Sequence, residues 1–194
     1  MRALLPADIA MYTTRLPIFP GDLRERTTRY ASGYAPALAS FGSLALDASY
    51  IAMTGASYAL ELDGDRALVD QLATAAKTPV WTASLAIVEA LQALQVRAIV
   101  LISPYPQWLT DRALAYWESA AIKVDQVIKF GEEFRAYQLT DVEVAERLAQ
   151  VKPPADSAIV MSGTGMMSLR VIAAMRASIA VPIVSSNLCG AWRL

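Results

Sequence analysis

Histidine is absent from the 194-residue sequence. Its absence excludes Ser-His-Asp triads, Cys-His pairs and metal sites with histidine ligands. Acid–base chemistry must therefore come from carboxylates, tyrosine, lysine or the single cysteine, Cys189. One cysteine cannot form a disulfide within the chain, which fits the cytoplasmic location that we expect. No neighbour in the sequence would lower the pKa of Cys189, so a small buried residue is favoured over a nucleophile.

Charge is also sparse, since 18% of the residues are charged and the formal net charge is −1. This balance gives no electrostatic signature of nucleic-acid binding, and we expect no nucleic-acid partner. No apolar run is long enough to cross a bilayer and no signal peptide precedes the first expected strand, so we expect no membrane partner. Hydrophobic residues make up 55% of the chain, which is typical of an α/β protein with buried parallel strands.

Short apolar runs alternate with segments whose apolar residues recur at helical spacing. This βαβ order predicts a mostly parallel sheet with right-handed crossovers. Thr140 and Asp141, followed by Glu143, are typical of a capped helix start. We expect strands at residues 8–14, 49–54, 78–82, 97–103, 123–130, 157–161 and 181–186, and helices within 23–41, 65–77, 87–94, 109–117, 141–151 and 169–178.

Polar loops follow three of the expected strands, with the sequences MTGAS (53–57), SPY (103–105) and SGTG (162–165). Ligands of such folds bind at the carboxyl ends of the strands. The hydroxyls of Thr54 and Ser57, with main-chain N–H groups, suit the binding of a carboxylate. Taken alone, each of the two glycine-containing loops is more typical of a tight turn with a helix N-cap. A cleft between two halves of the molecule would bring both glycine-containing loops onto one small acid.

Two further residues have two interpretations each. Tyr105 is either a hydrogen-bond or proton donor to the same ligand or an aromatic side chain packed under a proline-rich loop. Arg15 is either a partner for a carboxylate or part of a surface ion pair. Nucleotide binding is not indicated, because SGTGMM lacks the third glycine of a dinucleotide fingerprint and no lysine follows it as in a P-loop.

The whole chain resembles the aspartate/glutamate racemase superfamily, in the branch of maleate cis–trans isomerase and arylmalonate decarboxylase. The segments that carry the resemblance are, in order, TTRLP, MTGAS, PVWTASLAIVEALQALQVRAIVLISPYP, IVMSGTGMMSLRVI and VPIVSSNLCGAW. The resemblance implies an α/β fold of two Rossmann-like parallel-sheet halves related by a pseudo-twofold, with the active site in the cleft between them. We expect the halves to be residues 1–80 plus 185–194 and residues 81–184, the first lacking its N-terminal strand because the chain opens with MRALLP.

The resemblance also implies chemistry on a small carboxylate without a metal or an organic cofactor, and it is compatible with a homo-oligomer. Members use one or two cysteines at the strand ends to move protons or attack the substrate. Here the first cysteine position is Met53 and the second is Gly163. Neither side chain can exchange a proton. The other matches are Thr54, after the first cysteine position; Tyr105, in the carboxylate pocket; Gly163, Thr164 and Gly165, in the second loop; and Asn187, in the SSN ending.

Two hypotheses follow. The first is a cofactor-independent decarboxylase or isomerase/racemase-type protein acting on a small carboxylic or dicarboxylic acid, with Tyr105, water or a displaced Cys189 as the proton source. The second is a catalytically inactive relative that binds a small carboxylate, or a degenerate copy.

Overall fold

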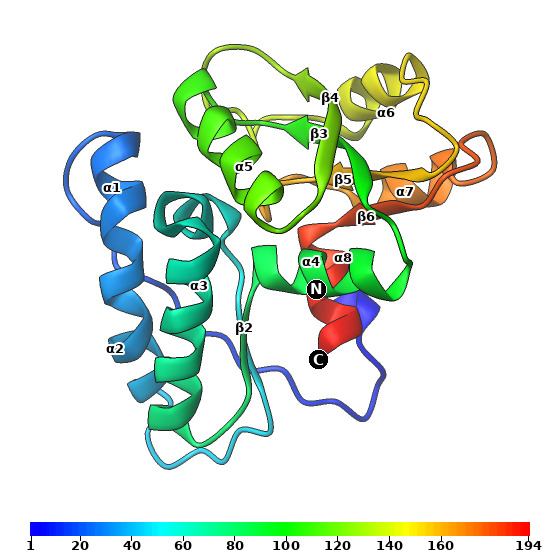
Figure 1. Cartoon of the computed structure of the whole chain (residues 1–194). Coiled ribbons are helices and arrows are strands. Elements are labelled where there is room, and N and C mark those ends of the chain that lie inside the picture. The colour runs from blue at the N-terminus through cyan, green and yellow to red at the C-terminus, as the bar shows by residue number, and fades with distance from the viewer.

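The computed structural model describes residues 1–194 and contains two separate parallel sheets (Figure 1). The larger sheet has the strand order β4-β3-β5-β6, and every neighbouring pair in it is parallel. The smaller sheet pairs β1 with β2, also in parallel. The strands are β1 (Ser49–Ile51), β2 (Val80–Thr82), β3 (Ala98–Ser103), β4 (Lys123–Lys129), β5 (Ser157–Met161) and β6 (Ile183–Ser185). The predicted α/β fold with two parallel-sheet halves is confirmed.

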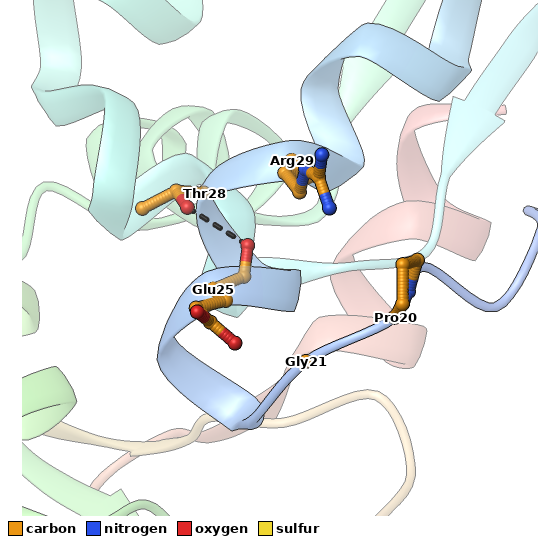
Figure 2. A pocket seen from close by; sticks show the side chains of 5 residues that line it. All are labelled: Pro20, Gly21, Glu25, Thr28 and Arg29. Atoms are coloured by element: carbon orange, nitrogen blue, oxygen red, sulfur yellow. Dashed lines mark hydrogen bonds between the residues drawn. The ribbon is translucent and has the colours of Figure 1, made fainter.

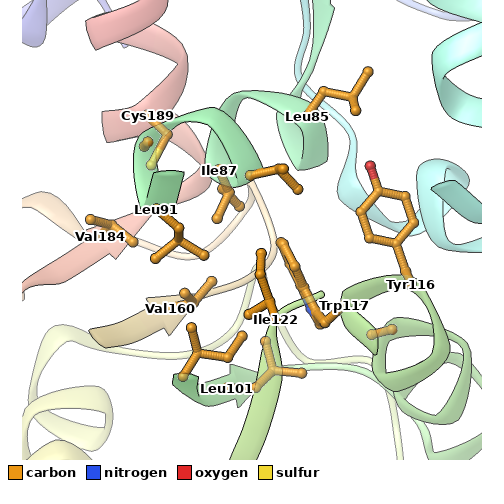
Figure 3. Close-up of a cluster of buried hydrophobic side chains, with 14 of the residues drawn as sticks. Leu85, Ile87, Leu91, Leu101, Tyr116, Trp117, Ile122, Val160, Val184 and Cys189 are labelled. Carbon is orange, nitrogen blue, oxygen red and sulfur yellow. The ribbon is translucent and has the colours of Figure 1, made fainter. Parts of the chain in front are cut away.

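The larger sheet is the centre of two hydrophobic clusters. Ile99 and Leu101 of β3 contribute to one cluster, whereas Val100 and Ile102 contribute to the other, because successive side chains of a strand point to opposite faces. Figure 3 shows part of the first cluster, which includes Leu101 and Trp117. The first cluster is covered by α4 (Ala83–Ala93), α5 (Gln107–Ser119) and α8 (Ser186–Arg193), and the second by α6 (Asp141–Ala149) and α7 (Leu169–Met175).

Most predicted elements of the larger sheet are confirmed within a few residues, since a central strand buried on both faces reads as a continuous apolar run. The start of α6 is confirmed as well. Thr140 Oγ1 accepts from the backbone N–H of Glu143 at 3.2 Å, and Glu143 Oε2 accepts from the backbone N–H of Thr140 at 2.8 Å. This reciprocal pair is a capping box, which satisfies donors that the helix itself leaves unpaired.

The smaller half contains short helices around one long helix. Figure 1 shows α1, α2 and α3 grouped together to one side of the larger sheet. Their bounds are α1 (Leu23–Arg29), α2 (Tyr34–Ala39) and α3 (Thr54–Ala76), with single 3₁₀ turns at Arg2–Leu4 and Tyr30–Gly33. None of the helices in the molecule is both long enough and apolar enough to cross a bilayer. The division at residue 80 coincides with the start of β2 and stays a prediction.

One prediction in this half is wrong, and another is incomplete. Residues 8–14 form no strand; they are irregular, and Met11 and Tyr12 are exposed, because β1 and β2 pair only with each other. The helix expected at residues 65–77 is confirmed as the longer part of α3, whereas the part that begins at Thr54 was not predicted. The two parts meet at a kink at Glu61, where φ is 63° and ψ is 170°. That conformation is nearly confined to glycine. The kink divides α3 into a short first part that begins at Thr54 and a longer second part.

Candidate active site

Thr54 and Tyr105 meet between the two halves. Thr54 is the first residue of α3 and follows β1, whereas Tyr105 follows β3 in the larger sheet. Thr54 Oγ1 and Tyr105 OH share a hydrogen bond of 2.5 Å, and both residues are buried. The structure therefore brings together the first two of the three predicted loops through the hydroxyls of two predicted site residues.

The third loop, residues 162–165, lies against the same place. A Cβ added to Gly163 would lie 3.5 Å from Tyr105 OH, so the predicted second cysteine position faces the phenol. Thr164 Oγ1 donates to the carbonyl of Ala52 at 2.8 Å, and Asn187 Nδ2 donates to the carbonyl of Thr164 at 3.0 Å. These two hydrogen bonds hold the loop between the end of β1 and the start of α8.

Gly163 has a conformation that other residues rarely adopt. Its φ is +99°, and an added Cβ would lie 2.8 Å from Cγ of Pro104, closer than real contacts allow. The loop is thus built around the lack of a side chain at this position. A cysteine here would require the loop to change its backbone conformation.

Three of the predicted or considered residues have other surroundings. Ser57 is buried and donates to Asp65 Oδ1 at 3.1 Å, so its hydroxyl already has a partner on its own helix. Met53 is half-buried and packs beside the small hydrophobic cluster of the smaller half. Cys189 lies in the first cluster of the larger sheet (Figure 3), where burial raises the pKa of its thiol to about 12. The thiol is therefore neutral and part of the core.

The electrostatics favour Tyr105 as a neutral donor. Burial raises the pKa of its phenol to about 12, although hydrogen bonding with Thr54 and Ser162 acts in the opposite direction. Ser162 also shares a hydrogen bond of 2.7 Å with Tyr58 OH. The hydroxyls of Thr54, Tyr58, Tyr105 and Ser162 thus form a buried cluster at the carboxyl ends of β1, β3 and β5, which we call the hydroxyl cluster. These hydroxyls can donate to an anionic oxygen when it replaces the hydrogen bonds that they make with one another.

An aromatic arm covers this cluster from residues 131–139, between β4 and α6. The ring of Phe134 stacks on Tyr105 with centroids 5.7 Å apart and an interplanar angle of 8°. Tyr137 contacts Phe134 edge to face, with centroids 5.4 Å apart. A Cβ added to Gly165 would collide with the ring of Tyr137, so that glycine allows the arm to lie against the third loop. The arm touches two of the three loops.

Two surface hollows lie outside the hydroxyl cluster. One, of about 480 Å³, is polar and lies along α1 (Figure 2). Its lining comprises Pro20, Gly21, Glu25, Thr28 and Arg29. The other, of about 460 Å³, shares Phe134 with the aromatic arm and is otherwise lined by Asp22, Leu23, Arg24, Arg26, Pro106, Trp108 and Glu133. Only the second hollow reaches a ring that contacts Tyr105.

The sequence model of the family described as arylmalonate decarboxylase matches residues 34–194, which is more than half of the chain. The chain belongs to the arylmalonate decarboxylase family. The predicted resemblance is thereby confirmed. No curated protein has a sequence significantly similar to this member of the arylmalonate decarboxylase family. The assignment of Met53 and Gly163 to the two cysteine positions stays a prediction.

Solved structures of related proteins share the fold of this family member. A cysteine-to-serine mutant of the Nocardia farcinica maleate cis-trans isomerase, with a covalently bound succinylcysteine intermediate, has a TM-score of 0.86 at 16% identity, covering 99% of this chain and 82% of that one. A cysteine-to-alanine variant of the Pseudomonas putida maleate isomerase, with maleate, has a TM-score of 0.82 at 18% identity, covering 88% and 71%. A double mutant of arylmalonate decarboxylase in the liganded form has a TM-score of 0.79 at 19% identity, covering 91% and 75%.

Sequence reasoning about this arylmalonate decarboxylase family member missed Phe134, Tyr137 and Asp65. The two aromatic residues lie in a segment without regular structure, where spacing gives no information about contacts. The one feature of the sequence that could have indicated their role is the presence of two aromatic residues three positions apart in a connecting loop. The sequence predicts that a helix begins at Asp65, and a carboxylate at the start of a helix indicates a capping role, not a buried one.

Proposed function

We propose that the protein binds a small carboxylic or dicarboxylic acid at the hydroxyl cluster and acts on it as a cofactor-independent decarboxylase or isomerase/racemase-type catalyst. The observation that carries the proposal is the contact between Thr54 and Tyr105 at the ends of strands from both halves, with Gly163 beside it. Family membership supports the substrate class. The relatives named above include maleate isomerases, one of them holding maleate.

A ligand carboxylate would replace the hydrogen bond that Thr54 and Tyr105 now make with each other. Both hydroxyls then donate to carboxylate oxygens, and hydrogen bonds to a charged acceptor are stronger than those between neutral groups. Tyr105 is protonated at neutral pH, because burial raises the pKa of its phenol to about 12. It therefore binds as a donor and does not act as a base in its resting state.

Proton transfer is the demanding part of the reaction. Decarboxylation leaves a carbanion that must take up a proton, and racemisation requires a proton to leave and return. Met53 and Gly163 cannot carry that proton, and the Cys189 thiol is held in the core. We propose that Tyr105 or a water molecule beside Gly163 supplies the proton to the carbanion and regains one from solvent. In racemisation, that water also takes the proton that leaves the substrate.

A second candidate function is carboxylate binding without turnover. The observation that favours it is the conformation of Gly163, whose φ of +99° and close approach to Pro104 leave no room for a nucleophilic side chain. In that case the protein senses or holds a small acid at the same hydroxyls.

The test follows both binding and exchange. Phenylmalonate, malonate, maleate and hydantoins are incubated with the protein in heavy water, and NMR follows deuterium uptake and the conversion of maleate to fumarate. Thermal shift measures binding of the same compounds. A ligand at 100 times its Kd stabilises the folded state by about 2.7 kcal/mol. Exchange or conversion supports the catalyst, binding without either supports the second candidate, and the lack of binding and of both reactions contradicts the carboxylate site.

Tyr105→Phe is the matched variant for that test, since it keeps the ring that stacks on Phe134 and removes the hydroxyl. We expect ligand binding to weaken by about 10- to 100-fold, the effect of one hydrogen bond to a charged group. Tyr12→Phe, an exposed tyrosine in the irregular N-terminal segment, is the control and leaves binding unchanged.

A further inference from the structure

Asp65 is a fully buried carboxylate in the longer part of α3. Its Oδ1 accepts a hydrogen bond from Ser57 Oγ at 3.1 Å, and its Oδ2 accepts from Thr82 Oγ1 and from Tyr116 OH, each at 2.8 Å. None of the ion pairs in the molecule includes Asp65. A buried carboxylate without a cation is costly, so the three hydroxyls are what make it tolerable there.

The three donors come from different parts of the fold. Ser57 lies in the short first part of α3, before the kink at Glu61. Thr82 ends β2 and is the N-cap of α4, and Tyr116 lies on α5, beyond β3. Asp65 therefore connects both parts of α3 with elements of each half of the molecule.

The same two helices lead to the hydroxyl cluster. Thr54 lies one helical turn before Ser57 on α3. Tyr105 lies two residues before the start of α5, and its carbonyl accepts a hydrogen bond from Thr110 Oγ1 on that helix at 3.3 Å. The helices α3 and α5 pack against each other, so their relative position sets the distance between Thr54 and Tyr105. The α3 and α5 sides are thus linked at two points: through the hydrogen bonds of Asp65, and through the hydrogen bond between Thr54 and Tyr105.

We propose that Asp65 is a positioning residue of the candidate active site, which keeps Thr54 and Tyr105 at hydrogen-bonding distance by fixing the first turns of α3 against α5. The inference rests on the proposed function only in treating this pair as the carboxylate-binding group. Removal of the carboxylate leaves three buried hydroxyls without their acceptor, and each such group is expensive. Their rearrangement moves the turn that carries Thr54.

The experiment compares Asp65→Ala and Asp65→Asn with Asp70→Ala, an exposed carboxylate on the same helix. The full chain is labelled with 3-fluorotyrosine, and the ¹⁹F resonance of Tyr105 is assigned by its loss in Tyr105→Phe. Malonate is the binding probe. In Asp65→Ala we expect the Tyr105 resonance to shift and the Kd for malonate to rise by about tenfold, as for one lost hydrogen bond to a charged group.

Asp65→Asn separates hydrogen bonding from charge. Its amide oxygen accepts from Thr82 and Tyr116 and its NH₂ group donates to Ser57 Oγ, so residue 65 keeps hydrogen bonds to all three side chains. We expect this variant and Asp70→Ala to keep the wild-type Tyr105 resonance and malonate affinity. A purely structural Asp65 would lower stability in Asp65→Ala without moving the Tyr105 resonance of the folded protein, and that result overturns the proposal.

Two single-donor variants decide the question if Asp65→Ala does not fold. Ser57→Ala releases the first turns of α3, and Tyr116→Phe releases α5. A shifted Tyr105 resonance in these variants supports the proposal, and an unmoved resonance in both overturns it. If malonate fails to bind the wild type while the Tyr105 resonance still responds to Asp65, the positioning role is supported and the carboxylate site is contradicted.

Discussion

The two halves of this protein are stabilised in different ways. The larger sheet has two central strands of buried apolar residues, and its first cluster, which also includes Tyr58 and Leu62 of α3, comprises 20 buried residues. The smaller half has two strands of three residues each, and its cluster comprises four buried residues. The smaller half also contains the buried Asp65 and the strained Glu61.

This difference indicates which residues of the candidate site are held firmly in place and which can shift. Tyr105 and Gly163 stand at the ends of central strands, whose apolar packing fixes them firmly. Thr54 stands on the smaller half, whose placement depends on polar contacts such as those of Asp65. Polar contacts are directional, so they specify one arrangement but add little stability.

Core truncation should show the largest contrast between the halves. Leu101→Ala in β3 is expected to lower the free energy of unfolding by about 2–5 kcal/mol, since a buried leucine leaves a cavity in the large cluster. Leu72→Ala, in the four-residue cluster of the smaller half, should have a smaller effect. Urea unfolding measures both variants, and equal losses of stability would refute the comparison.

A side chain at Gly163 should be the next most damaging change. Gly163→Ala is expected to lower the free energy of unfolding by about 1–3 kcal/mol, because its φ is +99° and the new Cβ meets Pro104. Gly42→Ala is the control, since Gly42 also has a positive φ, of +61°, but an added Cβ there meets no atom within 4 Å. If thermal unfolding shows the same loss for both, contact with Pro104 plays no part.

Glycine at position 61 should stabilise the smaller half. Glu61→Gly relieves the strain at φ 63°, ψ 170°, and the gain in free energy of unfolding is expected to be about 0.5–2 kcal/mol after the greater flexibility of unfolded glycine is subtracted. Glu61→Ala removes the same exposed carboxylate but keeps the strain, so it should give no such gain. Denaturant titration of the two variants distinguishes strain from charge.

The smallest expected effect is a pH dependence centred on Asp65. Burial raises the pKa of Asp65, whereas its three hydroxyl partners act to lower it. A carboxyl whose pKa is higher in the folded state stabilises that state fully below its unfolded pKa of about 3.9, and this contribution is lost as the pH rises through the folded value. The neighbouring phenols of Tyr34 and Tyr116 stay neutral, because burial and the charge of Asp65 raise their pKa values.

Asp65→Asn removes this titration while keeping hydrogen-bond partners. The stability of the wild type relative to Asp65→Asn should therefore fall as the pH rises above about 4, the pKa of an unfolded aspartate, as measured by urea unfolding at several pH values. A constant difference across that range would show that Asp65 has the same pKa in the folded and unfolded states.

The secondary structure around the larger sheet was more predictable from the sequence than that of the smaller half. Its central strands read as continuous apolar runs, and Thr140 with Glu143 gave the start of α6. In the smaller half, residues 8–14 show a strand-like pattern but find no strand to pair with. The first part of α3 was missed because TGAS reads as a turn, and the helix there forms against packing partners that are distant in the sequence.

The sequence by itself determined the chemical inventory of this protein: no histidine, a single cysteine, polar loops after three apolar strands, and the matches that place it in its family. Only the tertiary structure decided how that inventory is used. It paired Thr54 with Tyr105, turned Ser57 toward Asp65, buried Cys189 and laid Phe134 over the phenol. Each of these outcomes depends on how α3, α5 and the larger sheet pack together, and periodicity along one chain segment contains no information about packing between segments.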